Sequence, residues 1–253
     1  MAETFVVNGT RMAAEDAVAQ IVQNEMGNTF QVEALKAQAV ATYTYIQYNG
    51  GVVSGVGLKS NVSNVVSNAV RSVLGEMVVD AASGRPILAV YHSSSAGVTN
   101  PAQAVWGRNV SNLVSVESPY DNDTATLTLS REKVESYVTK NLNVNLQDDP
   151  AEWFQILDYT TSDNLYVNNM MVGDVKTTGR KFRENILRDS SILLRSAAFT
   201  VRYDSSSDQF IFQTKGYGHG AGMSQKGANA YASRGYSYKQ ILTHYYSSAR
   251  VVG

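Results

Sequence analysis

Cysteine is absent from this 253-residue sequence, so disulfide bonds, thiolate nucleophiles and cysteine-ligated metals are excluded. Charged residues make up only 17% of the chain, the formal net charge is -1, and no cluster of lysine or arginine stands out. This balance gives no reason to expect a nucleic-acid partner. Sparse charge with 15 tyrosines fits an uncharged polar ligand such as a carbohydrate, although tyrosines are more often ordinary half-buried residues.

Long apolar runs are also missing, since none approaches the roughly 18 residues that a membrane-spanning helix needs. The opening Met1-Ala2-Glu3-Thr4 has neither the basic start nor the apolar stretch of a signal peptide. We therefore expect either a cytoplasmic protein or the soluble part of an exported chain. With 43% hydrophobic residues and no internal repeat, the chain is long enough for one large domain or two small lobes.

Apolar periodicity predicts helices near both ends of the chain. Five segments follow the helical period: about 13–26, 31–47, 62–74, 224–233 and 237–246. The second of these carries a small-residue face of Ala34, Ala37 and Ala41, which allows another element to approach closely. Ser237 and Gln240 have the spacing of a capping box at the start of the last helix.

The middle of the chain is rich in strand signals. Runs of Val, Ile, Leu and Tyr predict strands at about 76–79, 87–92 and 113–116. An alternating pattern predicts a hairpin of 199–203 with 209–213. We also expect a turn at 121–123 and a short helix over 130–141. Helices at both ends, packed on a strand-rich middle, favour an α+β fold. We expect one domain over residues 1–253, with a core lobe of about 1–124 and 199–253, an inserted smaller lobe of about 125–198, and a central substrate cleft.

Glu25 is the most informative acidic residue, because it continues the apolar stripe of Val18, Ile21 and Val22 just before a turn. At that spacing its side chain is expected to point toward protein rather than water. Burial raises the pKa of a carboxyl group, and a raised pKa suits a general acid for glycosidic cleavage near neutral pH. A structural alternative, in which a partly buried Glu25 pairs with Lys36 or a backbone donor, explains the pattern at least as well.

A second carboxylate is harder to find. Glu33 lies in the first turn of its helix, where the helix dipole favours a negative charge, and that structural role is sufficient to explain it. Hydrolysis of a glycosidic bond ordinarily uses two carboxylates that flank the bond. The sequence therefore offers one good candidate, Glu25, and one doubtful candidate, Glu33.

Two of the three histidines lie in segments that can approach a ligand. His92 ends an apolar strand and opens the small-residue segment 93–97, and His219 lies in the glycine-rich loop 216–222, which runs into the start of a helix. That loop lacks the Lys-Ser/Thr ending of a phosphate loop, and serines 93–95 lack the nucleophile-elbow pattern. His244 is expected to be structural or on the surface, and the wide spacing of the three histidines does not support a zinc site.

Two long motifs give a family resemblance. The first comprises Asn24-Glu25-Met26, residues 33–41 (EALKAQAVA) and Thr44-Tyr45; the second comprises residues 218–228 (GHGAGMSQKGA), Ile241-Leu242 and His244-Tyr245-Tyr246. Two shorter motifs lie between them: Tyr91–Gly97 with Trp106-Gly107, and Leu194-Arg195-Ser196 with Phe199. With these motifs in the same order over nearly the whole chain, the sequence resembles the SpoIID/LytB domain family.

The resemblance implies a lytic transglycosylase of peptidoglycan, which cleaves glycan strands already stripped of their stem peptides, in sporulation or in cell-wall remodelling. The family's catalytic glutamate falls on Glu25. Such an enzyme needs no water, because one residue first protonates the leaving oxygen and then takes the proton of the sugar's 6-hydroxyl, which closes a 1,6-anhydro ring. This would explain the missing second carboxylate, and it implies no cofactor.

Three departures from the family matter. Many members have arginine where this chain has Tyr43, so a positive group is missing there. Some members carry cysteine near the motif histidine and bind zinc; this chain has serine, so we expect no metal. The membrane anchor of some members is absent, so we expect an extracytoplasmic chain that is either secreted or the exported part of a longer protein.

Several residues are expected to position sugar hydroxyls and N-acetyl groups: Lys36, Gln38, His92, Ser94, Ser95, His219, Ser224 and Gln225. Gln38 has an equally good structural explanation, and Trp106 either stacks on a sugar or belongs to the core. The expected partners are peptidoglycan glycan strands and a cell-wall amidase of the stage II sporulation protein P type. Two rival functions stay open: a non-catalytic glycan-binding enhancer of an amidase, and an ordinary glycosidase using Glu25 and Glu33 with water.

Overall fold

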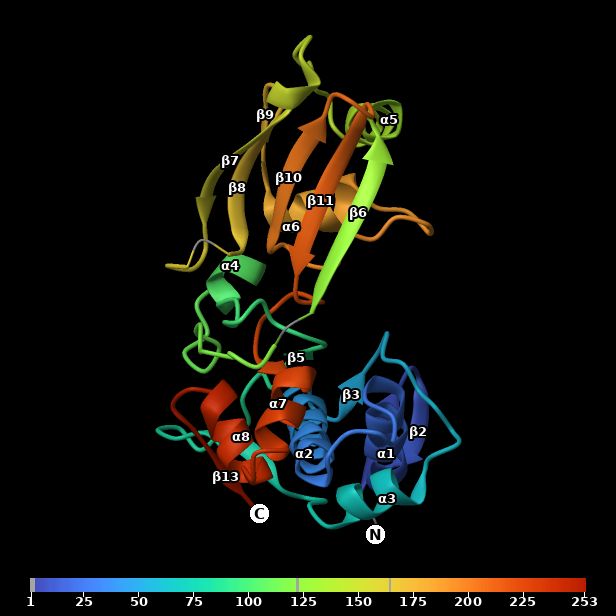
Figure 1. Cartoon of the computed structure of the whole chain (residues 1–253). Coiled ribbons are helices and arrows are strands. Elements are labelled where there is room, and N and C mark those ends of the chain that lie inside the picture. The colour runs from blue at the N-terminus through green and yellow to red at the C-terminus, as the bar shows by residue number, and fades with distance from the viewer. Residues whose placement is uncertain (1–2, 122, 164) are drawn as a thin grey trace.

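The computed structural model describes residues 3–121, 123–163 and 165–253. Helices and strands gather in different parts of the chain, as the α+β prediction required, and Figure 1 shows a helix-rich lower part and a sheet-rich upper part. The expected turn at 121–123 includes Asn122, which lies outside the described residues. Within the described ranges, no helix is both long and apolar enough to cross a membrane.

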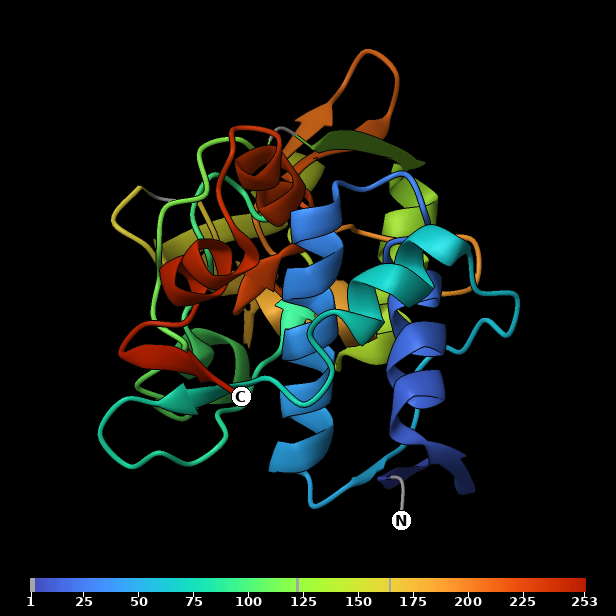
Figure 2. The ribbon, with the colours of Figure 1, turned by 90° about the horizontal axis from the view of Figure 1, so that it is seen from below.

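The lower part is built around one buried helix. Its helices are α1 (Ala14–Glu25), α2 (Val32–Tyr48), α3 (Asn64–Arg71), α7 (Gln225–Ala232) and α8 (Tyr238–Tyr245). Figure 2 shows α2 in the middle, with α1 and α3 on one side and α7 and α8 on the other. Ala34, Ala37 and Ala41 are fully buried, because small side chains let neighbouring helices approach α2 closely.

Short strands close the edges of this helical cluster. A three-stranded sheet has the order β2-β1-β3 and consists of β1 (Thr4–Val7), β2 (Thr10–Ala13) and β3 (Val52–Val53). Two further strands pair antiparallel, β4 (Met77–Asp80) with β13 (Ala249–Val252). Residues from both ends of the chain thus share one core, in which Val40, Ile46, Ile241 and Tyr246 are fully buried. The two termini of the sequence fold together although more than 150 residues separate them.

The upper part contains two three-stranded antiparallel sheets, with the orders β10-β11-β6 and β7-β8-β9. Its elements are β6 (Thr124–Ser130), α5 (Arg131–Asn141), a 3-10 turn η1 (Pro150–Glu152), β7 (Phe154–Tyr159), β8 (Val167–Val172), β9 (Val175–Thr178), α6 (Gly179–Lys181), a π-helical turn η2 (Phe182–Ile186), β10 (Phe199–Asp204) and β11 (Gln209–Lys215). Five phenylalanines pack ring against ring in its core. This second core is separate from the one around α2.

Three short elements lie between the two parts: β5 (Tyr91–His92), α4 (Ala102–Trp106) and β12 (Met223–Ser224). Strands β5 and β12 pair in parallel, with Met223 opposite Tyr91 and Ser224 opposite His92. This pair joins two of the sequence motifs, the one around His92 and the one that follows the glycine-rich loop.

The terminal helices, the helix capped by Ser130 and the hairpin of β10 and β11 confirm the predictions, and Ser237 with Gln240 forms the expected capping box. Two predicted strands are wrong. Only Tyr91–His92 of the 87–92 segment is a strand, and 113–116 is irregular chain that makes four hydrogen bonds with Thr99. The segment 87–92 is buried or half-buried along its length, whereas in 113–116 only Leu113 is buried and Val114 is 41% exposed. An apolar run therefore does not by itself indicate a strand.

The hairpin lies in a different part of the molecule from the one expected. It was expected with the terminal helices, but β11 pairs with β6, and Phe199, Phe210 and Phe212 belong to the second core. The boundary at residue 199 therefore needs correction, since the chain returns to the lower part only after β11. A strand at 124–130, which the sequence analysis did not predict, supplies the pairing edge that holds the hairpin there.

Candidate functional site

Glu25 is the last residue of α1, and its side chain is exposed. Val18, Ile21 and Val22 are buried as the stripe predicted, but the expectation that Glu25 would follow them into the protein is wrong. Met26, one residue later, occupies the buried position at the helix end. Gly27 then adopts a φ of +68°, which ends the helix and leaves Glu25 at its solvent-facing rim.

One side chain from the far end of the sequence holds the Glu25 carboxylate. Gln225, the first residue of α7, donates from Nε2 to Glu25 Oε2 at 3.0 Å. The same Nε2 lies 3.4 Å from Gln38 Oε1 on α2, and Gln38 Nε2 donates to Thr42 Oγ1 at 3.2 Å. Gln38 and Gln225 are buried, so an exposed carboxylate is attached to a buried amide network.

Tyr91 lies on the edge of this network. Burial raises the pKa of its hydroxyl, and the nearby negative charge of Glu25 raises it further. Tyr91 therefore stays a neutral hydroxyl at physiological pH. It was not among the predicted site residues, although the motif that begins with it had been singled out.

The glycine-rich loop brings β12 against β5 through very close backbone contacts. Gly222 has a φ of +72°, and a Cβ at that position would lie 2.1 Å from the carbonyl oxygen of Val90. No other residue fits there, which explains at least one glycine of the loop. The loop thereby sets the register that places Gln225 beside Glu25.

His92 is buried behind this strand pair, with 4% of its surface exposed. Its Nδ1 lies 3.0 Å from the carbonyl oxygen of Ala221, so Nδ1 carries the proton and donates to that oxygen. Its Nε2 has no hydrogen-bond partner among the described residues. Burial lowers the pKa of His92 to about 4, so the ring is neutral and presents an open lone pair.

His219 packs beside His92, with ring centres 5.7 Å apart, and also against Trp106, with ring centres 5.3 Å apart. The backbone N–H of Ala221 donates to His219 Nδ1 at 3.1 Å, and burial lowers the pKa of His219 to about 3. Trp106 is half-buried in this row of rings. The structure therefore brings His92 and His219 together, and both rings are neutral.

Asp121 is the residue that the sequence analysis missed. Its Oδ1 accepts from Ser94 Oγ at 3.2 Å and Ser224 Oγ at 2.9 Å. Its Oδ2 accepts from Ser118 Oγ at 2.7 Å, from the backbone N–H of Ser95 at 3.2 Å, and from Ser95 Oγ. No local pattern marked this residue, because its five donors come from three separate segments of the chain.

The Asp121 cluster changes the picture of three predicted substrate contacts. Ser94, Ser95 and Ser224 are almost fully buried, and each hydroxyl already donates to Asp121. Ser224 is also the N-cap of α7, where its Oγ accepts from the N–H of Gly227 at 3.0 Å. These hydroxyls fix the start of α7 beside Glu25, and they do not face solvent.

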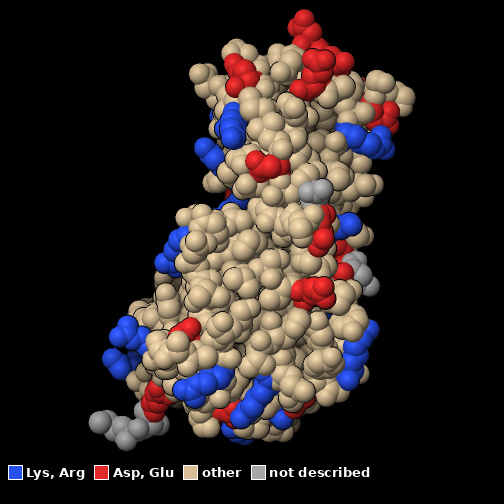
Figure 3. Space-filling model, turned by 90° about the vertical axis from the view of Figure 1, so that its left-hand side faces the viewer, with Lys and Arg blue, Asp and Glu red and all other residues tan. Residues whose placement is uncertain are grey.

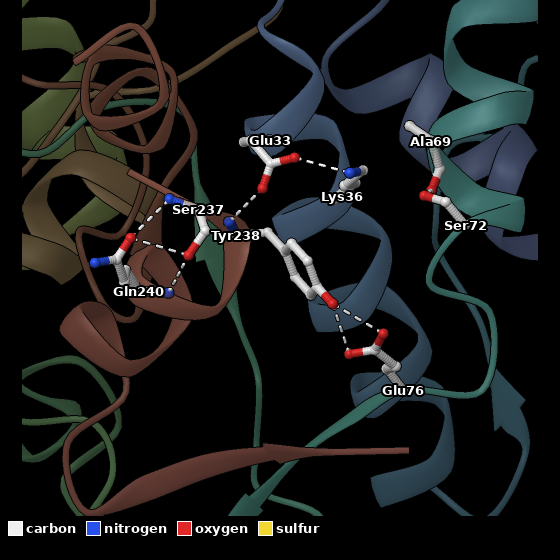
Figure 4. Close-up of polar contacts among 8 residues, drawn as sticks. All are labelled: Glu33, Lys36, Ala69, Ser72, Glu76, Ser237, Tyr238 and Gln240. Atoms are coloured by element: carbon white, nitrogen blue, oxygen red, sulfur yellow. Dashed lines mark hydrogen bonds and ion pairs between the residues drawn. The ribbon is translucent and has the colours of Figure 1, made fainter. Parts of the chain in front are cut away.

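Lys36 lies on another side of α2 from Gln38, as residues two positions apart in a helix do. Its Nζ contacts Glu33 Oε1 at 2.8 Å, while Glu33 Oε2 accepts from the backbone N–H of Tyr238, the first residue of α8, at 2.8 Å. Figure 4 shows this contact between α2 and α8, together with the Tyr238 hydroxyl on Glu76. Lys36 and Glu33 therefore join two helices.

The environment of Glu33 favours its charged form. Burial alone would raise its pKa, but the hydrogen bonds from Lys36 and Tyr238 and the charge of Lys36 together hold the pKa below the usual value. Both carboxylate oxygens are engaged. Glu33 thus lies in the first turn of α2, as predicted, and its carboxylate also accepts from the first backbone N–H of α8, which the sequence did not predict.

The predicted site residues divide into three groups in the structure. Glu25, Gln38 and Gln225 share one network, His92 and His219 pack against each other with tilted rings, and the three serines surround Asp121, whereas Lys36 lies apart from Gln38. A cavity of about 410 Å³ lies in the upper part, between β6, β10 and β11, and Glu25 does not line it. The expected cleft at Glu25 stays a prediction.

The face in Figure 3 has a broad uncharged area in its centre, with Lys, Arg, Asp and Glu at the edges, toward the upper end and along the lower rim. In the part of the chain that the structure describes, His, Asp and Glu side chains form no group of three that could hold a metal ion. The site thus consists of one exposed carboxylate with amides, hydroxyls and neutral imidazoles around it.

Comparison with known proteins gives the same resemblance as the motifs. Residues 4–82 match the SpoIID family model, described as stage II sporulation protein. Stage II sporulation protein D of Bacillus amyloliquefaciens is 29% identical, over 94% of this chain and 73% of that protein. The Bacillus subtilis (strain 168) protein of the same name is 27% identical, over 94% and 74%.

A relative with a different name is equally similar. The amidase enhancer of Bacillus subtilis (strain 168) is 27% identical over 89% of this chain and 39% of that protein. Residues 4–82 include Glu25 and Gln38, while Gln225 and the glycine-rich loop are matched only in the comparisons that span most of the chain. The predicted resemblance to the SpoIID/LytB family is confirmed.

Proposed function

Because this chain resembles stage II sporulation protein D over most of its length, we propose that it is a lytic transglycosylase of peptidoglycan. It would cleave the bond between N-acetylmuramic acid and N-acetylglucosamine in glycan strands stripped of their peptides, and leave 1,6-anhydro ends. The observation that carries the proposal is the contact between Gln225 and Glu25. It joins the two long sequence motifs at a carboxylate that is exposed at a helix end.

The proposed reaction needs only one carboxyl group. Glu25 donates a proton to the glycosidic oxygen as the bond from that oxygen to C1 of the muramic acid breaks. The Glu25 carboxylate then takes the proton of the 6-hydroxyl, whose oxygen bonds to C1 and closes the anhydro ring. Gln225 holds Oε2, so Oε1 is the atom proposed to face the substrate.

The neighbouring groups would position the sugars. The Gln225 amide beside Glu25 and the half-buried Tyr91 hydroxyl would supply neutral donors and acceptors of the kind that sugar hydroxyls and N-acetyl groups need. Gln38 and the Nε2 of His92 are buried, so we propose that they act through their neighbours. We propose that Ser94, Ser95 and Ser224 act indirectly, through Asp121 and the start of α7. Lys36 would act through Glu33 and the position of α8.

The two rival functions differ in how well the geometry supports them. A hydrolase that used Glu25 and Glu33 would need Glu33 available to activate water, but both of its oxygens hold other groups. A binding-only role has one specific observation in its favour, the similarity to the amidase enhancer. Binding alone requires no proton transfer at Glu25, so an experiment that detects cleavage products can distinguish this role from the lyase reaction.

The experiment is to incubate the protein with purified glycan strands from which an amidase has removed all peptides, and to analyse the products by mass spectrometry. We expect fragments that end in 1,6-anhydro muramic acid, each lighter by one water than a reducing end. Reducing ends would instead indicate hydrolysis. Intact strands that the protein nevertheless retains would indicate binding alone.

Glu25→Gln should lower the rate of cleavage by at least about 1,000-fold, because an amide can neither give nor take the proton. The variant should still bind strands, and its free energy of unfolding should change by less than about 0.5 kcal/mol, since the side chain is exposed. Glu15→Gln is the matched control, because Glu15 lies at the other end of α1 in an ion pair with Arg71. Cleavage by Glu25→Gln at more than a tenth of the normal rate would refute the assignment.

We also propose that the protein works outside the cytoplasm, where its substrate lies, in sporulation or cell-wall remodelling. An amidase of the stage II sporulation protein P type would supply the stripped strands. The similarity to an amidase enhancer supports a link to such a partner.

A further inference from the structure

A second concave site lies in the upper part of the molecule. A cavity of about 340 Å³ is formed by the first half of β6, the segment before β10, and the end of β11 with the residue that follows Gly216. Among its lining residues are Thr126, Ser191, Leu193, Arg195 and Tyr217. Its volume is within the range of small-ligand sites.

The residues that line this cavity include apolar groups that can contact a sugar ring and an arginine that can bind an anion. Leu193 and Tyr217 are exposed apolar groups, at 39% and 38%, and such surfaces pack on the C–H faces of sugar rings. The Arg195 guanidinium lies over the Tyr217 ring, 5.6 Å from its centre. Among residues 3–121, 123–163 and 165–253, no carboxylate forms an ion pair with Arg195.

The cavity is joined directly to the segment that carries His92 and His219. The backbone of Tyr217 pairs with Ser94 in both directions, at 2.7 and 3.0 Å. The N–H of Gly218 donates to the carbonyl oxygen of Arg195 at 3.0 Å, and a Cβ at Gly218 would lie 3.0 Å from Cβ of His92. The glycine-rich loop therefore contributes to the Glu25 side of the molecule and to this cavity within a few residues.

We propose that this cavity binds a muramic acid unit of the glycan strand through its free lactyl carboxylate, with the sugar against Tyr217 and the carboxylate on Arg195. The proposal rests on the proposed function and names the feature of the substrate that is selected. In a strand that carries peptides, the lactyl carboxyl is an amide without charge. Once an amidase has removed the peptide, it is an anion that a guanidinium can bind with two hydrogen bonds.

The test compares binding of two probes by proteins that also carry Glu25→Gln, so that strands are not cut. One probe is peptide-stripped glycan, which has lactyl carboxylates, and the other is an oligomer of N-acetylglucosamine, which has none. Arg195→Gln should weaken binding of the stripped glycan by about tenfold and leave binding of the neutral oligomer within about twofold. Tyr217→Ala should weaken binding of both probes.

Matched controls lie outside the residues that line this cavity. Arg202→Gln removes an exposed arginine from β10, and Tyr48→Ala removes a tyrosine that is 44% exposed at the end of α2. Neither should alter binding. Equal binding of stripped glycan by Arg195→Gln and Arg202→Gln, or equal weakening of both probes by Arg195→Gln, would overturn the proposal.

Salt supplies an independent readout. Binding of the stripped glycan should weaken as ionic strength rises, and this dependence should be smaller for Arg195→Gln. An unchanged salt dependence would count against the carboxylate contact. The outcome is separate from the proposed reaction, because a protein that binds stripped strands through Arg195 but makes no anhydro ends would refute the lyase function alone.

Discussion

Two carboxylates, those of Glu25 and Asp121, accept hydrogen bonds from the start of α7, and they differ in exposure and in the number of donors around them. Glu25 is exposed at the end of α1 and accepts one hydrogen bond, from Gln225. Asp121 accepts five, from Ser94, Ser95, Ser118 and Ser224. Ser224 and Gln225 are adjacent in the sequence, so the first residues of α7 bind both carboxylates.

The difference separates two uses of negative charge. A carboxylate surrounded by five donors is held in one place, which suits a structural centre. A carboxylate with one donor and an open side can meet a substrate and exchange a proton. We therefore propose that Asp121 serves mainly stability and Glu25 the reaction, and the following changes test that division.

The largest effect on stability is expected for Asp121→Ala. The change leaves four hydroxyls and one N–H without their acceptor at a mostly buried junction, so the free energy of unfolding should fall by about 3 kcal/mol. Urea unfolding followed by circular dichroism measures this. A loss no greater than that of Glu25→Gln would break the distinction between the two carboxylates.

Asp121→Asn is the accompanying variant, because its shape is conserved and one oxygen remains. It should cost less stability than the alanine variant and still lower the rate of cleavage, since the start of α7 and Gln225 would shift. Binding of glycan should change less than the rate does. An unchanged rate would show that the serine cluster does not position Gln225.

His92 should make the same junction sensitive to acid. Its folded pKa of about 4 lies below the unfolded value of about 6.5, so below pH 6.5 the unfolded chain binds a proton that the folded chain does not. The contribution of neutral His92 to the free energy of unfolding is therefore present above pH 6.5 and is lost as the pH decreases toward 4. The loss amounts to about 2 kcal/mol between pH 7 and pH 5.

His92→Asn keeps an N–H that can donate to Ala221 but cannot titrate in this range. The difference in unfolding free energy between the wild type and this variant should therefore shrink by about 2 kcal/mol from pH 7 to pH 5. His219 titrates in the same direction and remains in both proteins. A difference that stays constant with pH would contradict the buried, neutral state of His92.

The smallest effect is expected for Glu33→Gln. Glutamine can still accept from the N–H of Tyr238, so the variant loses mainly the partly exposed pair with Lys36, about 0.5–1 kcal/mol. Cleavage should stay within about twofold of the wild type. Loss of cleavage would place Glu33 in the reaction and revive the two-carboxylate hydrolase.

Much of the fold could be predicted from local pattern. The helices around α2 were found because their periodic stripes and caps are contained within a dozen residues, and the Ser237–Gln240 box is formed as expected. Segment 87–92 was harder, since an apolar run looks the same whether it pairs in a sheet or only crosses a core. The third strand beside the hairpin depends on a partner more than 70 residues away.

The candidate site could be predicted only in part, for a similar reason. Helical spacing placed Glu25 correctly at the end of α1, but which way a terminal side chain turns depends on whether Met26 or Glu25 occupies the buried position. The motifs singled out Ser94, Ser95 and Ser224 without showing what they bind. Their acceptor, Asp121, is isolated in the sequence and becomes central only when three segments meet.

The sequence by itself determined the helical ends, the glycine-rich loop, the absence of thiol chemistry and the position of Glu25 at a helix end, because these depend on residue type and short spacing. Tertiary structure alone decided that Gln225 holds Glu25, that the serines belong to Asp121, and that His92 is neutral. These facts depend on burial and on contacts between residues 100 to 200 positions apart. Hydrogen bonds and desolvation act over a few ångströms, and only the folded chain brings such distant groups that close.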